Sequence, residues 1–235
     1  MISREKFDFA ISSFSVLENQ LTDCMAYLPF IDENKQAVSP KFVPIIMDAC
    51  GLVDSIFFEI SSDNKSNEHF NLKKYSKIHE SSLKLDNNAT LFLASPIRLL
   101  QPYKGWTQEQ PNWWSAHNKL KHDRLNNYHF ATFTNAVQAL AGLHQLMVRQ
   151  RNFVGGFLKA GWIDTTNLEV LDNLGSAAYE GSKVDVVVES KLFASASYDN
   201  FVNPDTSDSL YFDVNYEANG LSNRIRNILF GHEVW

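Results

Sequence analysis

The stretch from Phe130 to Val148 constrains the fold more than any other part of the chain. Apolar side chains recur in it at steps of three and four residues, and small residues stand between them. The apolar positions are Phe133, Ala136, Val137, Leu140, Leu143 and Met147, and the small ones are Ala131, Ala139, Ala141 and Gly142. This spacing predicts an amphipathic helix that other elements approach closely.

Four earlier stretches repeat the helical spacing. They cover residues 5–28, about 40–60, about 70–85, and from Pro111 to Asp123 or Arg124. Before the last of them, Thr107 and Gln110 have the spacing of a capping box. Short to medium connections between helices are typical of an up-and-down antiparallel bundle. We therefore expect a mainly α fold, with such a bundle over residues 1–150.

The chain changes character after Arg151, where glycines become frequent. Residues 184–197 alternate and are rich in β-branched side chains, which predicts one or two strands. Residues 209–216 alternate in the same way, and residues 221–230 favour a short last helix. A further short apolar run, residues 90–94, is either a strand or a buried extended segment. We expect residues 151–235 to form a small α+β appendage packed on the bundle.

Charge and composition narrow the classes of function. The net charge is −6, and residues 1–150 hold 15 basic and 15 acidic side chains, so the deficit lies in residues 151–235. A local basic site in the first part is therefore compatible with the overall charge. No apolar run is long enough for a membrane span, and the first residues lack the apolar core of a signal peptide. With Cys24 and Cys50 expected as reduced core thiols, we expect a cytoplasmic protein.

Reactive side chains are densest between Trp113 and His129, WWSAHNKLKHDRLNNYH. Arg124 and His129 form an Arg-x4-His pair at the junction of two predicted helices. Arginine holds a phosphate through two hydrogen bonds, and histidine exchanges protons near neutral pH. Such a pair suffices for cleavage of RNA without a metal, by attack of the 2′-hydroxyl on the adjacent phosphate. In support we place Asn118, Lys121 and His122 as donors or charges, and Trp114 as a stacking platform.

Two alternatives to this interpretation stay open. The lysines and Arg124 also fit an ordinary solvated helix face, and tryptophans on a bundle helix are often core residues. A rival pair, Arg226 and His232, has five residues between its members, so the spacing alone does not select a site. No zinc-type spacing, Gly-rich phosphate loop or HExxH element occurs in the sequence, and we expect no metal or cofactor.

The run WWSAHNKLKHDR, followed by FATFTNAVQALAGLHQL, resembles the carboxy-terminal half of bacterial HEPN-superfamily proteins. The likeness is close over residues 111–148. It implies a helical bundle, usually dimeric, and a metal-independent endoribonuclease of a toxin or phage-defence system. Arg124 and His129 would then be the catalytic pair, facing a second subunit, with RNA as substrate and an antitoxin as a protein partner. The alternative is a non-catalytic HEPN-like module that binds or dimerises through a tryptophan-rich face.

Overall fold

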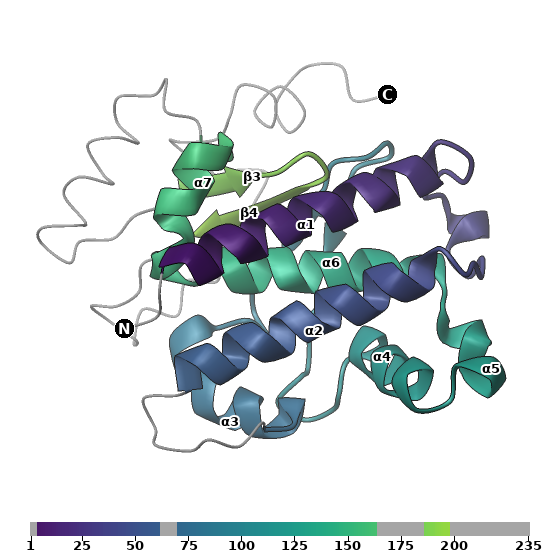
Figure 1. Cartoon of the computed structure of the whole chain (residues 1–235), viewed down its shortest axis with the longest axis horizontal. Coiled ribbons are helices and arrows are strands. Elements are labelled where there is room, and N and C mark those ends of the chain that lie inside the picture. The colour runs from purple at the N-terminus through teal and green to yellow at the C-terminus, as the bar shows by residue number, and fades with distance from the viewer. Residues whose placement is uncertain (1–3, 62–69, 164–185, 198–235) are drawn as a thin grey trace, which may run out of the picture.

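The computed structural model describes residues 4–61, 70–163 and 186–197, and these are mainly helical (Figure 1). Two short strands interrupt the helices, and a hairpin follows them. The elements are α1 (Arg4–Met25), η1 (Asp32–Asn34), α2 (Phe42–Ser61), α3 (Leu72–Leu83), β1 (Thr90–Phe92), β2 (Arg98–Leu100), α4 (Asn112–His122), α5 (Arg124–Asn127), η3 (Tyr128–Phe130), α6 (Phe133–Val148), η4 (Arg151–Phe153), α7 (Val154–Ala160), β3 (Val186–Glu189) and β4 (Phe193–Ser197).

Helix α6 is the central element, as its sequence predicts. It contacts α1, α2 and α4, as well as strands β1 and β4, and every residue from Ala139 to Val148 is buried. Helix α6 begins three residues later than predicted, because Phe130 ends η3 and Thr132 caps α6. The Thr132 side chain accepts a hydrogen bond from the Asn135 amide at 3.2 Å.

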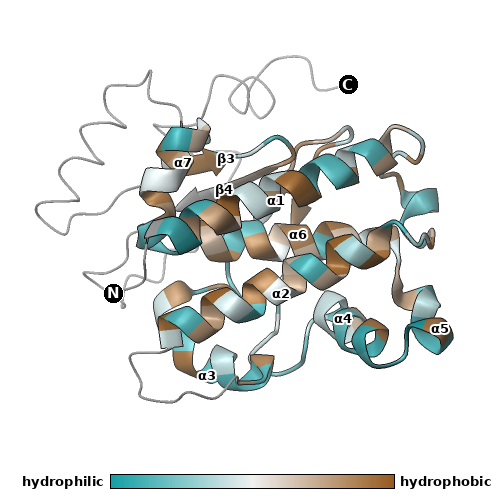
Figure 2. Ribbon diagram, in the orientation of Figure 1, coloured by the Kyte–Doolittle hydropathy of each residue, from teal (hydrophilic) through white to brown (hydrophobic). Residues whose placement is uncertain are grey.

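Helices α1 and α2 lie side by side with α6 (Figure 1), and the three contact one another. Apolar and polar residues alternate along α1 and α2 (Figure 2), as expected for helices with one buried face. A close approach between α4 and α6 depends on Gly142, because a Cβ there would lie 3.0 Å from the Trp113 ring. This contact explains the small residue at that position.

The strands form one antiparallel sheet in the order β2-β1-β4-β3. Strand β1 confirms the prediction for the apolar run at 90–94, and β3 and β4 confirm the predicted strands within 184–197. Strand β2 was not predicted from the sequence. It pairs with β1 through Leu91 opposite Leu99, so its partner rather than its own pattern makes it a strand.

The β3–β4 hairpin is joined to the first part of the chain in two ways. Strand β4 pairs with β1, and the connection between β3 and β4 packs on α1. There the buried Glu18 carboxylate accepts hydrogen bonds from the Ser190 hydroxyl at 2.6 Å and the Leu192 amide at 2.7 Å. The β3–β4 hairpin, which lies beyond residue 150, thus shares a sheet with strands that lie before it.

Several expectations concern other parts of the chain. The predicted strand at 209–216, the last helix at 221–230 and the pair Arg226 and His232 lie outside the described residues. Among the described residues, Cys24 and Cys50 are buried and not disulfide-bonded. No described helix is long and apolar enough to cross a membrane.

Candidate functional site

The segment between α4 and α6 is a sharp corner built around Asp123. This residue ends α4 and caps α5, and its backbone (φ −152°, ψ 83°) leaves the helical region. Its carboxylate accepts hydrogen bonds from the Asn126 amide at 3.2 Å and from Asn126 Nδ2 at 2.6 Å. The helix therefore ends where the sequence predicts, at Asp123, and α5 follows directly.

The capping box that Thr107 and Gln110 were expected to form before α4 is absent from the structure. Helix α4 begins at Asn112 with Pro111 as its N-cap, and this proline makes no side-chain capping hydrogen bond. Gln110 instead donates from Nε2 to the Ser115 hydroxyl at 3.0 Å. The start of the helix was thus predicted to within one residue, although the hydrogen bonds at its end differ from the expected ones.

The corner, which we define as residues 119–129, carries most of the predicted site residues. Within it, Lys121, His122, Arg124 and His129 are all exposed. Neither Arg124 nor His129 forms a hydrogen bond or ion pair with another described residue. Both side chains are therefore accessible to a ligand from solvent, as the predicted roles in phosphate binding and proton exchange require.

Positive charge dominates the corner. It holds Lys119, Lys121 and Arg124 against a single acid, Asp123. The hydrogen bonds from the Asn126 side chain and amide lower the pKa of Asp123, so its carboxylate stays ionised and is engaged within the corner. Lys119 lies over the Phe130 ring, with Nζ 3.8 Å from its centroid. The remaining basic groups face solvent.

Trp114 does not lie at the surface. Its side chain is only 6% exposed, and its ring packs edge-on against Trp113 with 5.7 Å between centroids. Trp113 is buried as well, and its Nε1 donates to the Pro102 carbonyl at 2.7 Å. The expected stacking platform is a core residue here, and the two tryptophans form no exposed face, because α4 turns both rings toward the rest of the protein.

His117 lies next to these rings on α4, between the core and the corner. It is 7% exposed, and its Nδ1 has no hydrogen-bond partner among the described residues. Burial lowers its pKa, and the nearby Lys121 ammonium lowers it further, whereas Asp54 acts in the opposite direction. His117 is therefore a neutral imidazole near pH 7, and Lys121 and Asn118 are close enough to affect its pKa.

Sequence reasoning missed Tyr128, which is 62% exposed on η3. Its ring lies 6.0 Å from that of His129, in an edge-on arrangement. Leu125 is the other large apolar side chain of the corner at the surface, with 88% exposure. The sequence could have indicated the exposure of Tyr128 and Leu125, because both residues fall between two amphipathic stripes and belong to neither.

The corner combines cations, an exposed aromatic ring and two exposed histidines. These groups bind phosphates, stack on bases and move protons. The described residues include no group of three His, Cys, Asp or Glu side chains that could hold a metal ion. Comparison of the chain with protein-family models, with curated proteins and with solved structures gives no match.

Proposed function

We propose that this chain is a HEPN-like protein that acts on RNA through the corner at residues 119–129. The observation that carries the proposal is the exposure of the basic side chains there, with Arg124 and His129 both unpaired among the described residues. The corner's one acid is occupied in capping α5. A cationic surface of this kind attracts the phosphates of a nucleic acid, even on a chain with a net charge of −6.

In this proposal Arg124 clamps the phosphate and His129 moves a proton. The 2′-hydroxyl of RNA attacks the adjacent phosphorus, a 2′,3′-cyclic phosphate forms, and the bond from phosphorus to the 5′-oxygen breaks. His129 accepts the 2′-hydroxyl proton while water protonates the departing 5′-oxygen, or the two roles are exchanged, and the Arg124 guanidinium stabilises the charge that develops on the phosphate. Asn118, Lys121 and His122 add a donor and positive charge nearby. Such cleavage needs no metal.

A base stacks on Tyr128 in this scheme, in place of the buried Trp114. An exposed ring beside a histidine offers a flat surface to an unpaired base. Such stacking contributes about 1–3 kcal/mol per base in single-strand binding.

A second subunit completes the proposed site. Arg124 lies on α5 and His129 on the following η3, so the two residues belong to different elements of the corner. A two-fold copy brings Arg124 of one subunit opposite His129 of the other.

We also propose that α1, α2, α4 and α6 form an up-and-down antiparallel bundle, which the contacts of α6 with the other three helices support. An antitoxin-like protein is the proposed partner.

The test is cleavage of single-stranded RNA in the presence of EDTA. Arg124→Ala and His129→Ala should each lower the cleavage rate by at least about a hundredfold, because each removes a group that acts in the transition state. Thermal stability should hardly change, since both side chains are exposed. Lys77→Ala, at an exposed position on α3, is the matched control. Cleavage at the wild-type rate by both variants would reject the assignment.

The second candidate is a non-catalytic binding or dimerisation module. The exposure of Leu125 and Tyr128 favours it, because large apolar side chains at the surface often mark interaction sites. In this case the protein cleaves no RNA, and Leu125→Asp abolishes a complex without unfolding the chain. Buried Trp113 and Trp114 take no part in that contact. Size-exclusion chromatography of wild type and Leu125→Asp tests the contact, and cleavage of RNA by the wild type separates the two candidates.

A further inference from the structure

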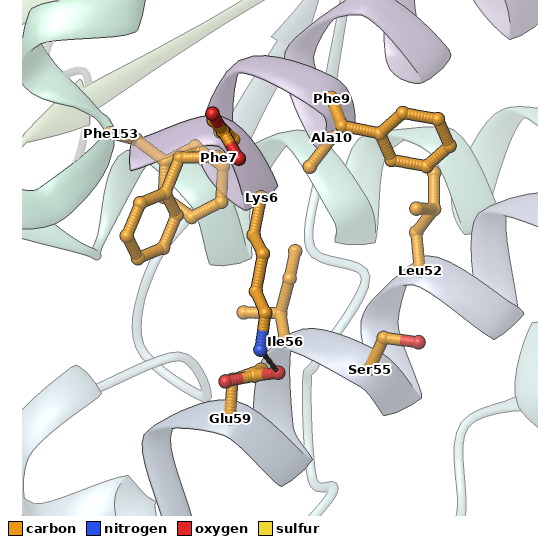
Figure 3. Close-up of a pocket in the computed structure, with 10 residues that line it drawn as sticks. Lys6, Phe7, Phe9, Ala10, Leu52, Ser55, Ile56, Glu59 and Phe153 are labelled. Atoms are coloured by element: carbon orange, nitrogen blue, oxygen red, sulfur yellow. Dashed lines mark hydrogen bonds and ion pairs between the residues drawn. The ribbon is translucent and has the colours of Figure 1, made fainter. Parts of the chain in front are cut away.

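A pocket of about 610 Å³ lies between the start of α1 and the second half of α2, far along the chain from the corner (Figure 3). Buried side chains of Phe7, Ala10, Ile56 and Phe153 line it. Pockets of roughly 300–1,000 Å³ with mostly apolar walls are typical of small-molecule sites. The walls therefore suit a ligand with an apolar body.

The rim of the pocket is polar and has an excess of negative charge. Lys6 reaches from α1 and pairs with Glu59 of α2 (Figure 3). Glu5 is exposed and has no ionic partner among the described residues. The Ser55 hydroxyl donates to the Gly51 carbonyl at 2.8 Å, so its oxygen is left as an acceptor. Because Lys6 and Glu59 are engaged with each other, Glu5 provides the negative charge that is left for a ligand at the rim.

An aromatic ring stands at the same rim. Phe9 is 68% exposed and faces Leu52 across the opening (Figure 3). The face of an exposed phenyl ring attracts cations. The Phe9 ring, the Glu5 carboxylate and the Ser55 hydroxyl oxygen all favour a ligand head that is positively charged and donates hydrogen bonds.

We propose that this pocket binds a small amphiphile with an alkyl or aryl body and a protonated amine. The body fills the apolar space, and the ammonium lies at the rim near Glu5 and the Phe9 ring, which stand one turn apart on α1. A carboxylate head is disfavoured, because it meets like charges and because Lys6 is already paired with Glu59. The proposal is independent of RNA and of the corner.

The test compares three probes that differ only in their heads: octylammonium, octanol and octanoate. Isothermal titration of the full chain, below the micellar concentration of each probe, gives the dissociation constants. Octylammonium should bind more tightly than octanol by roughly three- to fivefold, the effect of one exposed charge pair, and octanoate most weakly. Equal affinities, a preference for octanoate, or no binding of any probe would each overturn the proposal.

Variants of the rim sharpen the test, because two of them have opposite expected signs. Glu5→Gln should reduce the preference for octylammonium over octanol, because it removes the negative charge at the head. Lys6→Met should increase the preference, because it removes a nearby positive charge. Glu33→Gln, at an exposed acid on η1, is the matched control. If the two rim variants shift the preference in the same direction, the proposed placement of the head is wrong.

A third variant tests the apolar space itself. Leu52→Trp should abolish binding of all three probes by filling the opening, whereas Val16→Trp, on the exposed face of α1, should not. The probe series on the wild type decides the proposal even where Leu52→Trp fails to fold. A dimer that octylammonium dissociates would assign the pocket to a second copy of the chain and overturn the proposal.

Discussion

Glu18 offers a quantitative test of how the β3–β4 hairpin is held. Its buried carboxylate accepts hydrogen bonds from the Ser190 hydroxyl and the Leu192 amide. In Glu18→Ala the Leu192 amide loses its acceptor, which costs about 1–3 kcal/mol. The removed methylene adds about 1 kcal/mol. Ser190 already lies 3.3 Å from the Phe193 carbonyl and can donate there instead. The free energy of unfolding should fall by about 2–4 kcal/mol.

The comparison with Glu18→Gln isolates the charge of the carboxylate. Glutamine keeps an oxygen for both hydrogen bonds, so this variant should lose much less stability than Glu18→Ala. Burial raises the pKa of Glu18 above 4.5, although the hydrogen bonds from Ser190 and Leu192 oppose this effect. Because the folded pKa is raised, the stability from Glu18 is fully present below pH 4.5 and is lost as pH rises through the folded pKa.

The measured quantity is the free energy of unfolding in urea, for wild type and Glu18→Gln, at a series of pH values from 4 to 8. The wild-type value minus the variant value should decrease as pH rises from 4.5, by about 1.4 kcal/mol for each unit of pKa elevation, and then level off. Other titrating groups cancel in this difference. A difference that stays constant or increases with pH would refute the reasoning, because it would mean that the hydrogen bonds outweigh burial.

Two further predictions concern the core around α6. Burial lowers the pKa of His144 to about 3, so stability should fall as pH drops below 6.5, and His144→Leu should weaken that fall in urea titrations. An unchanged acid limb would contradict this effect. Gly142→Ala crowds Trp113, which costs about 1–3 kcal/mol, and gains roughly 1 kcal/mol of helix propensity, so it should lower stability by about 0–2 kcal/mol. Gly51→Ala, with nothing within 4 Å, has only the gain and should stabilise α2 by roughly 0.5–1 kcal/mol. Equal melting temperatures for these two variants would contradict the packing described for α4 and α6.

Local periodicity was sufficient for the longer helices α1, α2, α3, α4 and α6, whereas the short helices α5 and α7 were not predicted. Helix α6 was predicted to within three residues at its start, because its apolar positions repeat at three- and four-residue steps over the whole length. Strand β2 could not be found in this way, since Arg98–Leu100 is too short for a pattern and depends on pairing with β1. The position of β4 next to β1 depends likewise on contacts between residues about a hundred positions apart.

The candidate site shows a similar division. The sequence placed Arg124 and His129 at a helix junction, and their exposure agrees with an accessible site. It did not reveal that Trp114 is buried, because adjacent helical residues point about 100° apart and either tryptophan could have faced solvent. Tyr128 was overlooked for a different reason. It belongs to no apolar stripe, and exposure on a short turn is decided by tertiary packing.

The most direct test of the central proposal is the salt dependence of RNA binding by the corner at residues 119–129. Fluorescence anisotropy with a labelled single-stranded RNA, in EDTA, gives the binding constant at several salt concentrations. Arg124→Ala should weaken binding and reduce the slope of log affinity against log salt by about 0.7, as expected for one lost phosphate contact. Lys77→Ala should leave both unchanged. RNA binding that is undetectable in the wild type, or equally strong in Arg124→Ala, would contradict the proposal.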